Sequence, residues 1–238
     1  MPRSLPVTVL LALFALPVAA AEVRPDASEA AFGDFHRRFS LAAYAYPRHG
    51  AAALGLLGFD VYADVAVDRT FGDETFARAV LDDGLTGDML GVVRVGARKG
   101  LPGGFNLGVS YGRALETDVK LVSAEVQWSI LKGGPLTPAL ALRATGTRSL
   151  DDSAYTLDQY GAEILFSKGF TVLTPYVGAG VVRSEGTLDA TRGRTFTTTE
   201  TSGVLYAGVT LNLLLPKITV EVEKADVVQG AVRVAFGL

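Results

Sequence analysis

Hydrophobic and polar residues alternate along most of this chain. Between Val122 and Ile130, for example, every second residue is apolar, and the residues between them are Ser, Glu, Gln and Ser. A period of two indicates a β-strand with one apolar face. The pattern predicts ten strands, beginning near residues 55, 89, 105, 119, 137, 158, 171, 203, 217 and 228. In the strand at 171–183 it leaves open which face is apolar.

The predicted connections fall into two classes. Those at 100–104, 133–135, 169–170 and 215–217 are short, whereas 69–88, 150–157 and 184–202 are longer. We expect residues 187–201, rich in Thr and Arg, to form a mobile outer loop. Short turns at one end and longer loops at the other are typical of outer-membrane barrels, in which the short turns are periplasmic. An even strand count then places both ends of the barrel on the periplasmic side.

The stretch before the alternation has a helical period. Phe32, Phe35 and Phe39 share one helical face, and Asp26 followed by Glu29 resembles a capping box. We expect a short amphipathic helix at 26–39. It would cap or enter the periplasmic mouth of the barrel, or lie against the membrane interface.

The first 21 residues have the pattern of a secretory signal peptide. Arg3 precedes an apolar run at 5–18, and Ala19-Ala20-Ala21 forms a small-residue cleavage site. The run is too short for a membrane helix. Cleavage near Ala21 would change the net charge from −3 to −4. The expected organisation is a signal peptide at 1–21, a helical periplasmic segment at 22–50 and a barrel at 51–238.

Alternation alone fits two opposite barrels. A soluble, lipocalin-like barrel turns its apolar residues inward, whereas a membrane barrel turns them toward lipid. Here the apolar face carries almost no charge, and the lysines lie at the predicted strand ends. The last strand also ends in apolar alternation, through Phe236 and Leu238. The sequence therefore favours an all-β, antiparallel up-and-down transmembrane barrel of about ten strands (eight to twelve). A soluble exported lipocalin-like barrel is the alternative.

Several turn-and-strand segments carry a family resemblance. The segments 57–61, 99–105, 124–134 and 167–176 (LGFDV, KGLPGGF, AEVQWSILKGG and SKGFTVLTPY) resemble a family of uncharacterised proteobacterial outer-membrane β-barrel proteins. The resemblance covers most of the chain after the signal peptide. It implies a barrel fold and the outer membrane of a Gram-negative bacterium, and it implies no activity.

Composition excludes several classes of function. The chain has no cysteine, which excludes disulfides, thiol nucleophiles and thiolate metal sites. Its 22 basic residues do not exceed its 25 acidic ones, so no basic surface for nucleic acid is expected. A hydrophobic content of 49% is too high for a disordered chain.

The candidate catalytic and metal motifs are weak. Gly108–Gly112 matches the G-x-S-x-G nucleophile elbow, but it lies within a predicted strand, and His36 and His49 both precede it. Known outer-membrane enzymes resemble one another in using a histidine base near the outer rim, where neither histidine is expected. Acidic residues at 82, 83 and 88 do not have EF-hand spacing. We expect no catalytic centre, cofactor or metal.

The strongest constellation is a set of charged residues on the polar face of the strands. A turn centred at 134 places Glu125 opposite Arg143, and one centred at 153 places Arg143 opposite Glu163. A turn centred at 227 likewise pairs Glu221 with Arg233. Opposite charges on neighbouring strands stabilise a sheet, and charges in a confined lumen need such pairing. The predicted lumen set is Asp60, Asp64, Arg94, Arg98, Glu125, Arg143, Glu163, Glu221 and Arg233.

Two functions fit this lumen. In one, the charge pairs fill a narrow barrel, because side chains fill barrels near eight strands and open channels need about sixteen. The protein would then be structural, or act through interactions. In the other, the charges form the constriction of a narrow channel for small solutes or ions. The expected partners are outer-membrane lipid and the barrel-assembly machinery, which would recognise the C-terminal strand.

Overall fold

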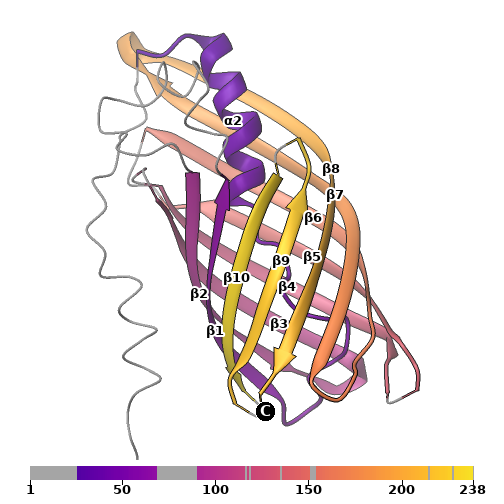
Figure 1. The fold of residues 1–238 in the computed structure, drawn as a ribbon. Coiled ribbons are helices and arrows are strands. Elements are labelled where there is room, and N and C mark those ends of the chain that lie inside the picture. Colours follow the sequence, from indigo (N-terminus) through magenta and orange to yellow (C-terminus); the bar gives the residue numbers. More distant parts are fainter. Residues whose placement is uncertain are drawn as a thin grey trace, which may run out of the picture.

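The chain forms a closed antiparallel β-barrel of ten strands with one helix (Figure 1). The computed structural model describes residues 26–68, 90–115, 117, 119–134, 136–150, 154–213, 215–226 and 228–237. Consecutive strands pair with each other, and β1 closes the barrel against β10. The predicted fold class is confirmed. The predicted signal peptide, the loop at 69–88 and its aspartates at 82, 83 and 88 lie outside the described residues.

The elements follow the chain in a simple up-and-down order. They are α2 (Glu29–Ala43), β1 (Phe59–Asp68), β2 (Leu90–Gly100), η1 (Pro102–Gly104), β3 (Phe105–Leu115), β4 (Lys120–Lys132), β5 (Ala139–Ser149), β6 (Tyr155–Ser167), β7 (Leu173–Ala190), η2 (Thr191–Gly193), β8 (Arg194–Asn212), β9 (Lys217–Lys224) and β10 (Val228–Gly237). Each lysine of these residues lies within or next to a strand end, as predicted.

The prediction of an outer loop at 184–202 is wrong. Strands β7 and β8 continue through it as a paired hairpin that turns at η2, with Thr187 opposite Thr197. Threonine has a high β-propensity. The inner face of the hairpin also packs in the hydrophobic cluster that contains α2, where Leu188 and Phe196 are buried. In Figure 1 the hairpin arches beyond the other strands at the end of the barrel opposite to the C-terminus.

The helix lies at this same end, and its capping residue differs from the prediction. Ser28, not Asp26, is the N-cap, and its side chain accepts a hydrogen bond from the backbone N–H of Ala31. The predicted apolar face is confirmed, since Phe32, Phe35 and Phe39 are all buried. We expected the helix at the mouth with the short turns. Instead it packs at the opposite mouth, against apolar residues of the barrel wall. These include Leu90, Val119, Tyr155 and Leu157.

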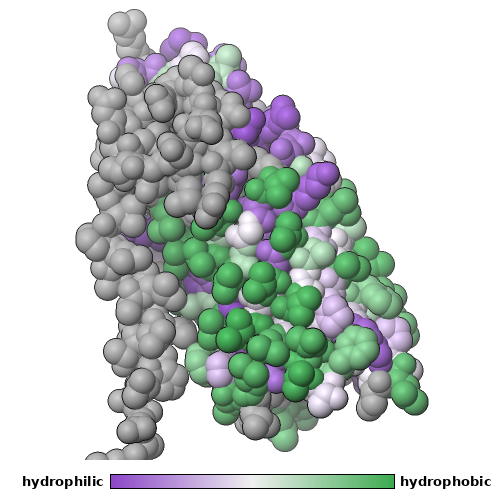
Figure 2. Space-filling model, viewed as in Figure 1, coloured by the Kyte–Doolittle hydropathy of each residue, from purple (hydrophilic) through white to green (hydrophobic). Residues whose placement is uncertain are grey.

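The outer wall carries an apolar band. On β4, Lys120 and Lys132 flank five outward residues, Val122, Ala124, Val126, Trp128 and Ile130. On β6, Asp158 and Lys168 are ten residues apart. At about 3.3 Å per residue and a tilt of about 40°, ten residues give a band about 25 Å tall. Figure 2 shows apolar side chains gathered over the middle and lower wall, with polar ones toward the end that carries α2.

Inside the barrel, tyrosines lie over glycines of neighbouring strands. Tyr206 is directly opposite Gly178, and Tyr176 is directly opposite Gly208. A Cβ at either glycine would overlap the tyrosine ring. This pairing also decides the parity of β7, which the sequence left open. Tyr176 faces inward, and Val177 is exposed on the outside.

Within the described residues, no helix has a stretch that is both long and apolar enough to cross a bilayer.

Candidate functional site

After α2, the chain passes through the barrel interior without forming a strand before β1. We call residues 44–58 the lumen segment; residues 44–48 are buried. Unpaired backbone carbonyls, like those at a helix C-terminus, need donors from elsewhere when they are buried. Inward side chains of the barrel supply these donors. At the end of α2, Gln159 donates to the carbonyl of Ser40 (2.7 Å), Gln229 to that of Leu41 (3.5 Å) and Arg94 to that of Ala43. In the lumen segment, Arg143 donates to the carbonyl of Ala45 (2.6 Å) and Arg233 to that of Pro47 (2.6 Å). Gln127 and Ser129 both donate to the carbonyl of Ala51 (3.1 and 2.7 Å).

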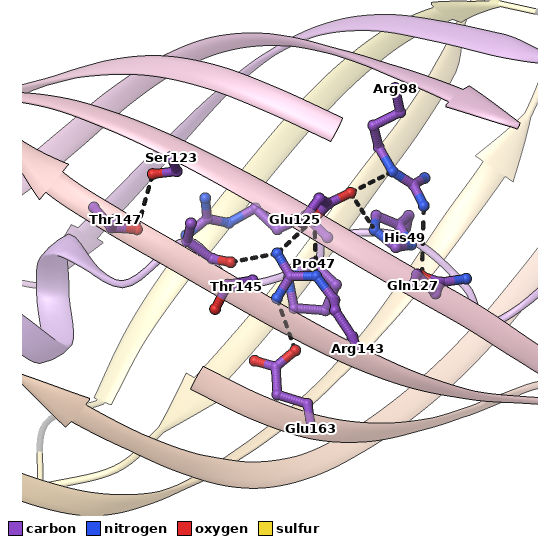
Figure 3. Close-up of polar contacts among 12 residues, drawn as sticks. Pro47, His49, Arg98, Ser123, Glu125, Gln127, Arg143, Thr145, Thr147 and Glu163 are labelled. Atoms are coloured by element: carbon purple, nitrogen blue, oxygen red, sulfur yellow. Dashed lines mark hydrogen bonds and ion pairs between the residues drawn. The ribbon is translucent and has the colours of Figure 1, made fainter. Parts of the chain in front are cut away.

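Five predicted lumen residues form one chain of ion pairs, the Arg143 cluster. Figure 3 shows the part of it around Glu125 and Arg143. Arg143 contacts Glu125 at 2.6 Å on one side and Glu163 at 2.7 Å on the other. Glu125 also accepts a hydrogen bond from Arg98 at 2.6 Å. Arg98 lies 3.9 Å from Asp60, which binds Lys217 at 2.7 Å. The cluster therefore connects five strands, β1, β2, β4, β5 and β6, through side chains alone, and Lys217 extends it to β9.

A second group, the Asp64 cluster, centres on a residue of the lumen segment. Arg48 is 1% exposed and binds Asp64 at 2.6 Å and Glu223 at 2.9 Å. Asp64 also binds Arg233 at 2.7 Å. Through these ion pairs Arg48 ties the lumen segment to the barrel wall.

Only part of the predicted register is correct. Arg143 lies opposite Glu163, as predicted. Arg143 does not lie opposite Glu125, because the turn after β4 is longer than expected and a bulge follows Ser129. Glu125 faces Thr145 instead. The long arginine still reaches the glutamate diagonally, as neighbouring strands allow.

The predicted pairing of Glu221 with Arg233 is wrong. Their turn is centred one residue earlier than expected, so Arg233 faces Thr219 on β9 and Asp64 on β1. Glu221 instead accepts a hydrogen bond from the Tyr176 hydroxyl at 2.5 Å. Arg94, the remaining predicted residue, is buried and donates to the backbone of α2.

Sequence reasoning missed Arg48, Glu223 and His49. The parity of β9 places Glu223 on the same face as Glu221, so a stricter reading of the alternation finds it. No periodic signal places Arg48 or His49 inside the barrel, because the lumen segment has no regular structure. His49 lies 3.7 Å from Glu125.

The histidine of α2 makes the contact that most resembles a catalytic pair. His36 lies 3.1 Å from the Ser184 hydroxyl and 2.7 Å from the Tyr155 hydroxyl. All three side chains are buried, with at most 3% exposure, so a substrate has no access to the pair. Burial lowers the pKa of His36 to about 4. The contact holds the helix against β6 and β7.

The other candidate chemistry has a structural explanation. Residues 108–112 lie inside β3 and not at a strand-to-helix turn, as the alternation predicts. Gly108 is small because Glu125 and Arg98 lie against it. Among the residues that the structure describes, no cluster of three or more His, Asp or Glu side chains could hold a metal.

Two cavities touch the lumen segment. One of about 170 Å³ lies near the short-turn mouth. It is lined by Asp60, Arg98, Lys217 and residues 48–50 and 52–54, among others. The other, about 10 Å³, lies beside Glu125 and Arg143. A cavity needs about 10–15 Å³ of space for the centre of a water molecule to hold one water, so the second cavity has room for one water at most.

Comparisons with known proteins found structural likenesses only. No protein-family model matches the chain, and no curated protein matches it. Solved structures with some likeness include a loop-deletion mutant of OmpT, an outer-membrane protein of Vibrio cholerae (10% identity, TM-score 0.33, 63% of this chain and 54% of that one). Another is Neisserial surface protein A (13% identity, TM-score 0.34, 76% of this chain and 96% of that one). A third is Ail of Yersinia pestis in complex with a heparin analogue (12% identity, TM-score 0.32, 76% of this chain and 95% of that one). This chain thus spans about half of the OmpT chain.

Proposed function

We propose that this protein is an outer-membrane β-barrel of structural or interaction type, whose lumen is filled by its own N-terminal segment and contains no catalytic centre. The observation that carries the proposal is the Asp64 cluster, in which Arg48 of the lumen segment is bound by two buried carboxylates of the wall. A segment held in this way occupies the space through which solutes would pass.

The outward apolar band supports the membrane location. Val126, Trp128 and Ile130 stand on the outside of β4 with about 40% of their surface exposed. A soluble barrel would turn such residues inward, whereas a band about 25 Å tall matches the hydrocarbon height of outer-membrane barrels. Export would depend on the signal peptide at 1–21, cleaved near Ala21. Lipid would contact the band, and β10 would be the strand recognised by the barrel-assembly machinery.

A narrow channel is the second candidate. The polar cavity at the short-turn mouth favours it, because Asp60, Arg98 and Lys217 could select ions there. Arg143 and the part of the lumen segment that contains Ala45 and Tyr46 lie between this cavity and α2. Conduction would require both to move aside.

Single-channel recording separates the two functions. The refolded full-length protein is reconstituted in lipid vesicles, and protease protection verifies its insertion. The same vesicles are then fused with a planar bilayer for recording. We expect no conductance steps, because the wall binds the lumen segment through both charge clusters. Discrete, salt-dependent steps from the inserted protein would show a water path and would favour the channel. A protein that does not insert would contradict the membrane location.

A further inference from the structure

The lumen segment has a direction through the barrel. Its end at 54–58 lies at the short-turn mouth, where Asn106 accepts a hydrogen bond from the Leu54 N–H and Lys99 binds the carbonyl of Gly58. From there β1 begins at Phe59 and runs back toward the other mouth. The segment's other end joins α2, which packs against the hairpin of β7 and β8. The chain therefore crosses the barrel twice before it reaches β2.

Both ends of the barrel itself lie at the short-turn mouth. Asp60, near the start of β1, pairs with Gly237, near the end of β10. In outer-membrane barrels the short turns face the periplasm and the longer connections face outward. The end that carries α2 is then the outer mouth. In Figure 1 the C-terminus and α2 lie at opposite ends of the barrel.

We infer that the barrel is threaded outward by its own N-terminal segment, so that Asp26 and the first turn of α2 are presented on the cell surface. This inference rests on the proposed function. The start of the helix is accessible, because Glu29 and Ala30 are exposed. The rest of α2 is fixed by Phe32, Phe35 and Phe39 and by the hydrogen bonds of His36. The helix is thus fixed at the outer mouth, while Asp26 and residues 28–30 stay exposed.

Chain length shows that a processed N-terminus cannot return to the periplasm through the lumen. Cleavage near Ala21 leaves four residues, 22–25, before Asp26. Four residues reach about 14 Å at most when fully extended, which is less than the height of about 25 Å of the apolar band. The barrel would therefore present any chain that precedes Asp26 on the cell surface, because the lumen segment is bound to the barrel wall.

Cysteine labelling tests this topology cleanly, because the chain has no cysteine of its own. Three single variants are made in the full-length protein at exposed positions: Ala30→Cys at the start of α2, Thr197→Cys on the β7–β8 hairpin and Leu136→Cys in a short turn. Intact cells are treated with a membrane-impermeant maleimide, and permeabilised cells provide the full-labelling reference. Heat-modifiable migration of each variant shows that the barrel has folded.

We expect Ala30→Cys and Thr197→Cys to be labelled on intact cells to at least half of the permeabilised value. Leu136→Cys should be labelled at least tenfold less before permeabilisation. Labelling of Thr197→Cys without Ala30→Cys on intact cells would overturn the threading and leave the proposed function standing. If neither is labelled on intact cells, or if Leu136→Cys alone is, the outer-membrane orientation fails and the threading fails with it.

Discussion

Replacement of Arg143 by methionine should destabilise the folded barrel strongly. Arg143→Met keeps an apolar stem of similar length and removes the guanidinium. Glu163 then loses its ion pair at 2.7 Å and keeps the weaker contact with the Tyr206 hydroxyl at 3.4 Å. The carbonyl of Ala45 loses a donor at 2.6 Å. Glu125 keeps Arg98, so its loss is partial.

The expected loss follows from the burial of the pair. Removal of one partner of a buried ion pair costs about 3–5 kcal/mol, because it leaves a buried charge without compensation. We therefore expect the free energy of unfolding to fall by about 3–5 kcal/mol, with the carbonyl of Ala45 contributing within that range. Urea unfolding of the refolded protein in detergent micelles measures it. Trp128, the single tryptophan, reports the transition by fluorescence, since it stacks on Phe105 of β3.

The same strand offers a matched control. Arg148 lies on the outer face of β5 with 67% of its side chain exposed, and it binds Asp158 at 2.9 Å. An exposed ion pair contributes about 0–1 kcal/mol, so Arg148→Met should change the unfolding free energy by no more than that. If Arg143→Met costs no more than Arg148→Met, the lumen charges do not stabilise the barrel and the reasoning is refuted.

Three further predictions concern the lumen, the helix and the outer wall. Gly161→Ala should cost about 1–3 kcal/mol of unfolding free energy, because its Cβ would overlap Tyr44, whereas Gly146→Ala, with no atom closer than 3.8 Å, should be nearly neutral. His36 has a pKa of about 4 in the folded state and 6.5 when unfolded, so folding stability should fall by up to about 3 kcal/mol as the pH drops from about 6.5 to about 4. His36→Gln should flatten this dependence in urea titrations, and an unchanged slope would exclude His36 as its cause. Val126→Arg, in the middle of the outer band, should cost about 2–4 kcal/mol in lipid vesicles, and a neutral effect would argue for a soluble barrel.

The fold was predictable because its signals are local. Strand alternation, strand number and the two classes of connection depend on residues close together in the sequence. The hairpin of β7 and β8 was not predictable in the same way. Its threonines are compatible with a loop or a strand, and the strand forms where α2 covers its inner face.

The register errors have one physical origin. Alternation fixes which face a residue occupies, but the turn fixes which residue it meets. The turn centred at 153 was placed correctly, and Arg143 meets Glu163. The turns after β4 and β9 differ from the expected centres by a single residue, and each moves the opposing residue by two positions. The alternation thus assigns a charged residue to the lumen more reliably than it identifies the residue opposite on the neighbouring strand.

The interior of this barrel cannot be understood from its wall alone. Arg94, Arg143 and Arg233 each donate to a backbone carbonyl of α2 or the lumen segment, so three buried arginines would lack these partners in an empty barrel. Arg48 in turn depends on the wall, because its buried charge would be unpaired if the carboxylates of Asp64 and Glu223 were absent. Each part thus satisfies groups that the other leaves unpaired, and burying such groups unpaired is costly. The lumen segment and the barrel wall therefore stabilise each other in the folded protein.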